Sequence, residues 1–190
     1  MIIGSPAAPF AALSALDGLE ASFGRQAWFS TLGEEPTEAE RADARLYLDG
    51  LGLGAIEVVW VADLAAARDT ARRSDWDRAW AEAERAATAA LTASVDAGIG
   101  RGHATDRFNR LMSNLSTIVT GPAATAAARF GLADPGLNRA MAGAAIQAAF
   151  ERALVAAADA GRDHPLAAKY RLFAGGRWPL TAAEGSFHIL

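Results

Sequence analysis

Residues 134–161, DPGLNRAMAGAAIQAAFERALVAAADAG, form the longest helical pattern in the chain. Asp134 precedes Pro135, a cap followed by proline at the first helical position, and Gly161 can end the helix. Small side chains recur along this helix as a smooth ridge, which lets a neighbouring helix approach closely: Ala140, Ala144 and Ala148, with Gly143 beside them. We therefore predict that this helix lies at the centre of a bundle. The large side chains expected around it are Trp76, Trp80 and Phe108, although a self-pairing surface would have the same pattern.

Caps, prolines and glycines divide the rest of the chain into further helical segments. The spacing of apolar residues predicts helices over 6–23, 38–50, 55–73, 75–97, 106–120, 122–131, 135–161 and 164–174. Short connections between them favour antiparallel neighbours. We predict a single all-α domain over 1–190, a compact bundle of seven or eight helices. Its helical body spans 1–171, and an extended tail, 172–190, docks on that body.

The segment 55–73 is the most ambiguous part of this prediction. Ile56, Trp60 and Leu64 fall on one helical face, but the run IEVVWV at 56–61 is rich in β-branched residues, which favour a strand. Because no partner strand lies nearby in sequence, we expect a helix here, with a short strand over 55–62 as the alternative.

The C-terminal tail, LFAGGRWPLTAAEGSFHIL, has a different character. Gly175 and Gly176 can end the last helix and reverse the chain, and proline biases Trp178 before it toward an extended backbone. Phe187 and Ile189 would share one side of an extended chain. A free tail would not carry so many large apolar side chains, since burying each one contributes about 1.5–3 kcal/mol. We expect the tail to dock across the helices.

Composition excludes several classes of function. The 22 acidic and 18 basic residues give a net charge of −4, and the arginines of 68–85 alternate with carboxylates, so a basic nucleic-acid-binding face is not expected. The chain has no cysteine and a single lysine, Lys169. No segment is a convincing signal peptide or membrane span. We expect a cytoplasmic protein without cofactor or metal.

Two short motifs invite a functional interpretation. GLGLGA at 50–55 resembles a dinucleotide-binding fingerprint, but that fingerprint requires a strand before it; a helix stop and a turn explain the same residues. Asp163, His164 and Asp159 could gather near a metal, yet helix capping accounts for them equally well. No familiar catalytic motif occurs, so the sequence leaves enzymatic activity undecided.

Two hypotheses for function remain. The first is a non-catalytic protein that acts through a protein partner or by self-association, using the alanine ridge or exposed aromatic residues. The second is an enzyme or a protein that binds a small anionic ligand in a pocket near the C-terminal Arg-Trp-Pro segment. Arginines would hold the anion, Trp178 would stack on the ligand, and histidines would assist. Its candidate residues are Arg171, Arg177, Trp178, His188 and His103.

Overall fold

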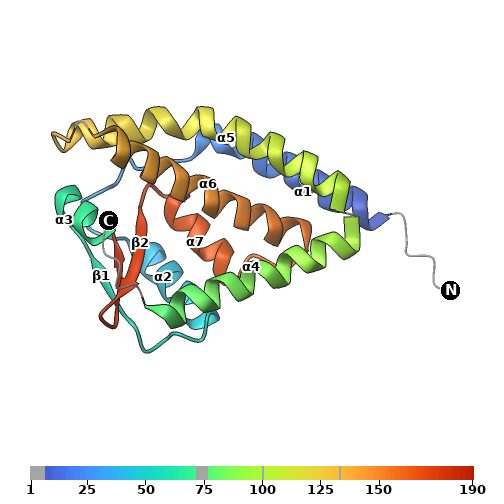
Figure 1. Cartoon of the computed structure of the whole chain (residues 1–190), viewed down its shortest axis with the longest axis horizontal. Helices are drawn as coiled ribbons and strands as arrows, with labels where there is room; N and C mark the ends of the chain where they lie inside the picture. Colours follow the sequence, from blue (N-terminus) through green and yellow to red (C-terminus); the bar gives the residue numbers. More distant parts are fainter. Residues whose placement is uncertain (1–6, 72–76, 100, 133) are drawn as a thin grey trace.

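The computed structural model describes residues 7–71, 77–99, 101–132 and 134–190. Within them the helices are α1 (Ala7–Ser22), α2 (Glu38–Gly50), α3 (Leu64–Ala71), α4 (Arg78–Ile99), α5 (Arg101–Arg129), α6 (Pro135–Ala157) and α7 (Pro165–Ala174), with a 3-10 turn, η1 (Phe23–Arg25). Three short strands are β1 (Glu57–Trp60), β2 (Pro179–Ala183) and β3 (Ser186–Ile189). The fold is predominantly helical, which confirms the predicted all-α class (Figure 1).

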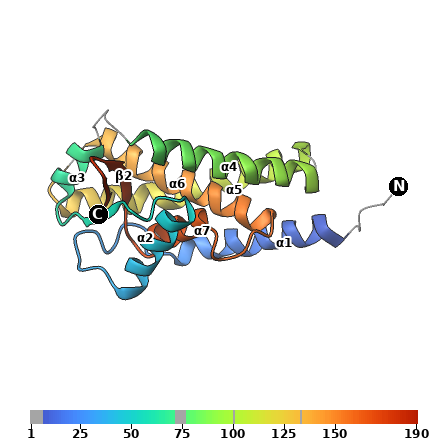
Figure 2. The same ribbon diagram turned by 90° about the horizontal axis from the view of Figure 1, so that it is seen from below.

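Helix α6 occupies the centre of the bundle, as predicted. It packs against α1, α4, α5 and α7, and Figures 1 and 2 show α1, α4, α5 and α6 running along the long axis. Its buried face differs from the predicted ridge: Met141, Ala145 and Ala148 are buried, whereas Ala140 is exposed and Ala144 half-buried. The buried face includes Met141, whose larger side chain covers more apolar surface than alanine does.

The predicted break at Gly121–Pro122 is wrong. Helix α5 runs through Pro122 without interruption from Arg101 to Arg129, so the separate helices at 106–120 and 122–131 are one. Proline in a helix costs about 3 kcal/mol. The residues around it, Val119, Ala123 and Ala127, are fully buried, and α5 packs extensively on α6. Burial of α5 against the rest of the bundle therefore outweighs the tendency of Gly121 and Pro122 to end a helix.

Several predicted helix boundaries also shift. Helix α4 begins at Arg78, where the Asp77 carboxylate accepts a hydrogen bond from the backbone N–H of Trp80 at 3.0 Å. Helix α6 ends at Ala157 rather than at residue 161. His164, not Asp163, caps α7. Trp76 and the predicted helix starts at residues 6 and 75 lie outside the described residues.

The predicted helix over 55–73 is wrong in its first half. Residues 57–60 form strand β1, and among the described residues of this segment the helical part is Leu64–Ala71, as α3. Strand β1 pairs in parallel with β3 in the register Glu57 to Ser186 through Trp60 to Ile189. The partner strand is the C-terminal one, more than a hundred residues away, which is why no local pattern revealed it.

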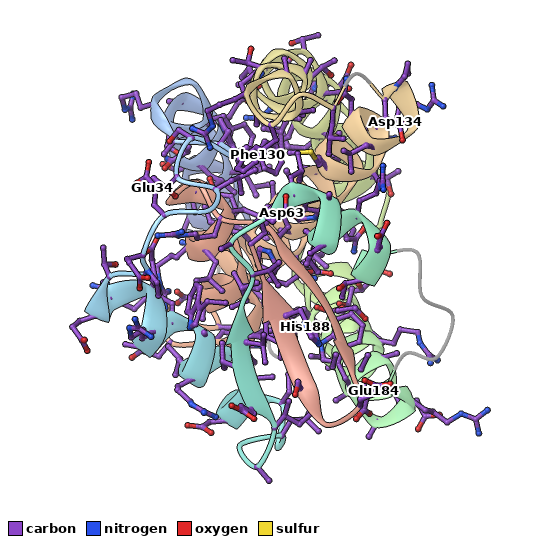
Figure 3. The ribbon with its side chains drawn as sticks, turned by 90° about the vertical axis from the view of Figure 1, so that its left-hand side faces the viewer. Glu34, Asp63, Phe130, Asp134, Glu184 and His188 are labelled. Carbon is purple, nitrogen blue, oxygen red and sulfur yellow. The ribbon has the colours of Figure 1, made fainter. Side chains whose placement is uncertain are left out.

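The C-terminal tail docks as predicted, in the form of a β-hairpin. Strands β2 and β3 are antiparallel, and the sheet order is β1-β3-β2. Glu184 and Gly185 both have positive φ, 53° and 75°, as a type I′ hairpin turn requires. The side chains of Phe187 and Ile189 face the core. Figure 3 shows the hairpin beside β1, at the end of the molecule that faces the viewer.

Gly176 permits the chain reversal between α7 and the hairpin. Its φ is 103°, and an added Cβ would lie 2.7 Å from Thr31 Oγ1 and 2.9 Å from the Thr31 nitrogen. We expect Gly176→Ala to lower the free energy of unfolding by about 1–3 kcal/mol, measured by urea denaturation. Gly143→Ala is the control: beyond the neighbouring backbone of α6 itself, no atom lies within 4 Å of its added Cβ, so it should stabilise α6 by about 0.5–1 kcal/mol. Equal urea midpoints for the two variants would contradict this account of the reversal.

Candidate functional site

The single lysine of the chain, Lys169 in α7, is buried between glutamates from two other helices. Its Nζ atom lies 2.5 Å from Oε1 of Glu84 in α4 and 3.1 Å from Oε2 of Glu151 in α6. The side chain of Glu151 is only 2% exposed. Charges this deeply buried need opposite charges and hydrogen bonds to offset their lost hydration. An ion-paired triad therefore joins three helices of the bundle.

Three further polar side chains complete the hydrogen bonding of this triad. The Tyr47 hydroxyl in α2 donates to Oε1 of Glu84 at 2.7 Å, and Trp80 Nε1 donates to the Tyr47 oxygen at 2.7 Å. Gln147 Nε2 donates to Oε1 of Glu151 at 2.9 Å. We call the six residues the Lys169 cluster: Tyr47, Trp80, Glu84, Gln147, Glu151 and Lys169.

Helical periodicity brings these residues together. Trp80 and Glu84 are four residues apart on α4, and Gln147 and Glu151 are four apart on α6, so each pair shares one helix face. Lys169 lies three residues after Leu166 and four before Phe173, which are both buried in α7. A lone lysine at core spacing, in a chain that otherwise uses arginine, is the sequence signal for this site. No residue of the Lys169 cluster is among the predicted ligand-binding residues.

Burial and charge shift the proton affinities in the cluster. Burial raises the pKa of the Glu151 carboxyl above its usual value, although the Lys169 charge opposes this. Burial alone would lower the pKa of Lys169, but the two carboxylates raise it, so the resting group is an ammonium. Burial and the nearby Glu84 charge raise the pKa of Tyr47, which keeps its hydroxyl protonated.

A cavity of about 320 Å³ opens onto the cluster. Tyr47, Gln147 and Lys169 supply its polar lining. Most of its wall is apolar or aromatic and comes from α4, α6, α7 and the C-terminal hairpin: Trp80, Ala144, Phe173, Pro179, Leu180 and Phe187. An apolar pocket with a few converging polar groups is the usual form of a small-molecule site. Pro179, the last residue of the Arg-Trp-Pro segment, lines this cavity, whereas the predicted ligand-binding residues Arg171, Arg177, Trp178 and His188 do not.

Arg177, predicted to bind an anion, is 2% exposed and fully engaged by the protein. Its guanidinium donates to both carboxylate oxygens of Glu40 and to the backbone carbonyls of Thr31, Glu34 and Glu35. These bonds use all five of its N–H donors. Its role in this structure is to fasten the tail to the loop before α2.

The other predicted site residues that the structure describes do not line the cavity above Lys169. Arg171 pairs with Asp43 at 2.6 Å and donates to the Arg162 carbonyl. Trp178 is buried and exchanges backbone hydrogen bonds with Leu190. His188 is half-buried in β3, opposite Thr181 (Figure 3). The side chain of His103 lies outside the described part of the chain. Their role in ligand binding stays a prediction.

Two motifs from the sequence have structural roles. The GLGLGA turn follows α2 and leads into β1, whereas the dinucleotide fingerprint follows a strand. Nδ1 of His164 accepts a hydrogen bond from the Leu166 N–H at 3.2 Å, which caps α7. Across the described ranges, no group of three or more histidine or acidic side chains is placed to hold a metal.

None of the helices in the described ranges combines the length and hydropathy that a membrane span requires. Comparison of the chain with protein-family models, curated proteins and solved structures gave no match. The proposed function therefore rests on the Lys169 cluster and its cavity.

The buried Glu151 carboxyl makes a testable contribution to pH dependence. Because its pKa is raised above 4.5, the folded state binds more protons than the unfolded chain between that value and the folded pKa. The contribution of Glu151 to stability therefore falls as pH rises through this interval. We compare the wild type with Glu151→Gln. The difference between their free energies of unfolding, wild type minus variant, should decrease as pH rises through this interval. Urea denaturation at a series of pH values measures this difference, and a rising difference would contradict the assignment.

Proposed function

We propose that this protein binds a small, uncharged and mostly apolar molecule in the cavity above Lys169. The observation that supports this most directly is the combination of aromatic walls with one buried ammonium group at the cavity lining. Burial of apolar ligand surface would supply most of the affinity. A carbonyl or hydroxyl oxygen of the ligand would accept a hydrogen bond from Lys169.

The charges of the cluster favour a neutral ligand. Glu84 and Glu151 already neutralise Lys169, so a bound anion would face two carboxylates within a few ångströms. A bound cation would face the ammonium, because Lys169 lines the cavity whereas the two carboxylates do not. Like charges at such distances repel strongly where water is excluded.

The test is a binding screen that compares neutral and charged forms of one scaffold. Acetophenone and benzyl alcohol should stabilise the protein in thermal denaturation and shift its NMR signals, whereas benzoate and benzylamine should bind at least tenfold more weakly. Ala144→Phe, which fills the cavity from α6, should abolish binding. Ala140→Phe is the matched control, since Ala140 lies one turn earlier and is exposed.

A second cavity variant covers the case in which Ala144→Phe disturbs the helix. Leu180→Trp fills the same cavity from the hairpin side and should also abolish binding while the circular dichroism spectrum stays unchanged. Unchanged affinity for the neutral compounds in both folded cavity variants would overturn the proposal.

Self-association or partner binding through the alanine ridge is the second proposal. It is supported by the exposure of Ala140 and Gly143, beside a groove of about 490 Å³ between α5 and α6. The buried side of the same helix packs inside the bundle. The part of the ridge that a partner could contact is therefore the exposed part, Ala140 and Gly143. Sedimentation equilibrium tests self-association: a dimer that Gly143→Glu dissociates would support it, and a monomer at high concentration would exclude it.

A further inference from the structure

Lys169 is placed to do more than donate a hydrogen bond to a ligand. Its amine is the only lysine nitrogen of the chain, it lines the cavity, and it touches a carboxylate that is almost completely buried. A carbonyl compound in the cavity would meet the Lys169 amine, whose nitrogen is hydrogen-bonded to the proton acceptor Glu151 behind it. These are the groups required for imine formation.

We infer that Lys169 forms an imine with an aldehyde or ketone held in the cavity, a step that rests on the proposed binding function. Glu151, 3.1 Å from Nζ, is the proton acceptor and donor. Glu84 also accepts a hydrogen bond from the nitrogen, and the same oxygen accepts one from the Tyr47 hydroxyl. The occupant is therefore a small apolar carbonyl compound, a narrower class than neutral molecules in general.

The reaction balances without any further reactant. Glu151 takes a proton from the Lys169 ammonium, and the free amine attacks the carbonyl carbon. The former carbonyl oxygen takes that proton from Glu151, and the nitrogen returns one of its protons to Glu151. The resulting hydroxyl then accepts this proton and leaves as water while the carbon–nitrogen double bond forms. One ammonium and one carbonyl group become one protonated imine and one water.

Glu151 fits the proton-transfer role better than Glu84 does. Oε1 of Glu84 already accepts hydrogen bonds from both Lys169 and Tyr47, and the Glu84 side chain is more exposed, at 17% against 2% for Glu151. Burial raises the proton affinity of Glu151. The cationic product occupies the place of the original ammonium, so Glu84 can remain its counter-ion.

The test is reductive trapping of the full chain with benzaldehyde and sodium cyanoborohydride. Trapping should add one benzyl group at Lys169, located by peptide mapping, with a rate that saturates as benzaldehyde increases. The chain's α-amino group is the internal reference and should react without saturation. Excess benzyl alcohol should slow labelling of Lys169 but not of the α-amino group.

Three variants make the result specific. Lys169→Arg should carry no label beyond the α-amino group, and Glu151→Gln should slow labelling of Lys169 at least tenfold. Glu82→Gln is the matched control, because Glu82 is an exposed carboxylate on α4 that pairs only with Arg78 among the described residues. Its labelling should equal that of the wild type. Circular dichroism checks that each variant is folded.

The outcomes separate this inference from the proposed function. Saturable labelling of Lys169 that depends on Glu151 supports both. Binding of benzyl alcohol in the cavity without preferential labelling of Lys169 overturns the imine and leaves the binding function intact. Labelling that is equal in Glu151→Gln and wild type overturns the role of Glu151. Absence of binding by either compound overturns both proposals.

Discussion

Lys169→Met is expected to lower the free energy of unfolding by about 3–5 kcal/mol, because it leaves two carboxylates facing each other without their cation. Glu84 and Glu151 both contact the Lys169 nitrogen, and Glu151 has almost no access to water. Methionine keeps much of the side-chain volume, so the loss reports the charge and not a cavity. Urea denaturation monitored by circular dichroism measures it.

The triple variant Lys169→Met, Glu84→Gln, Glu151→Gln is the control for this result. It removes all three charges and keeps the approximate shapes of the side chains, so it should recover a large part of the stability lost in the single variant. A single variant as stable as the wild type would show that the triad is not buried as described. A triple variant less stable than the single one would show that packing, and not charge, dominates.

Arg177→Ala is expected to lower the free energy of unfolding by a similar amount, about 3–5 kcal/mol. The change leaves Glu40 without its guanidinium partner and removes the donors to three backbone carbonyls of the loop before α2. Arg177→Lys should be intermediate, since an ammonium has three donors and cannot reproduce the planar fork. Both values come from urea denaturation.

Acid titration adds an independent check on the Arg177 pair. Burial alone would raise the pKa of Glu40, but hydrogen bonds from Arg177 and Thr37 lower it. The pair therefore stabilises the fold above the usual carboxyl pKa of 4.5, and this contribution is lost as pH falls through the lowered value. Arg177→Ala should flatten this part of the stability profile. Arg78→Ala, which breaks an exposed pair with Glu82, should change stability by less than about 1 kcal/mol.

Much of the helical architecture could be predicted because it depends on local patterns. Caps and glycines mark the ends of α2 and α7 closely, and the alternation of Phe187 with Ile189 predicts which side of the tail is buried. Each of these features is decided within about ten residues.

The two largest errors have the opposite origin, since they depend on residues outside the segment itself. Strand β1 exists because the C-terminal strand β3 pairs with it, and α5 continues through Pro122 because α6 packs along it. The same applies to the site. Arg177 and Arg171 were predicted as anion-binding residues, and the sequence does not indicate that they pair with Glu40 and Asp43 on α2. The sequence shows that Lys169 is unique but not which carboxylates surround it.

The most direct measurement is an NMR spectrum of the protein labelled with ¹⁵N only in lysine, which contains a single side-chain ammonium. Burial and two carboxylate partners should slow proton exchange, so a sharp Nζ signal should persist at neutral pH and move when benzyl alcohol saturates the cavity. The same signal should not move in Ala144→Phe. An Nζ signal that exchanges as fast as that of an exposed lysine, or that stays fixed at saturating ligand, would contradict the account.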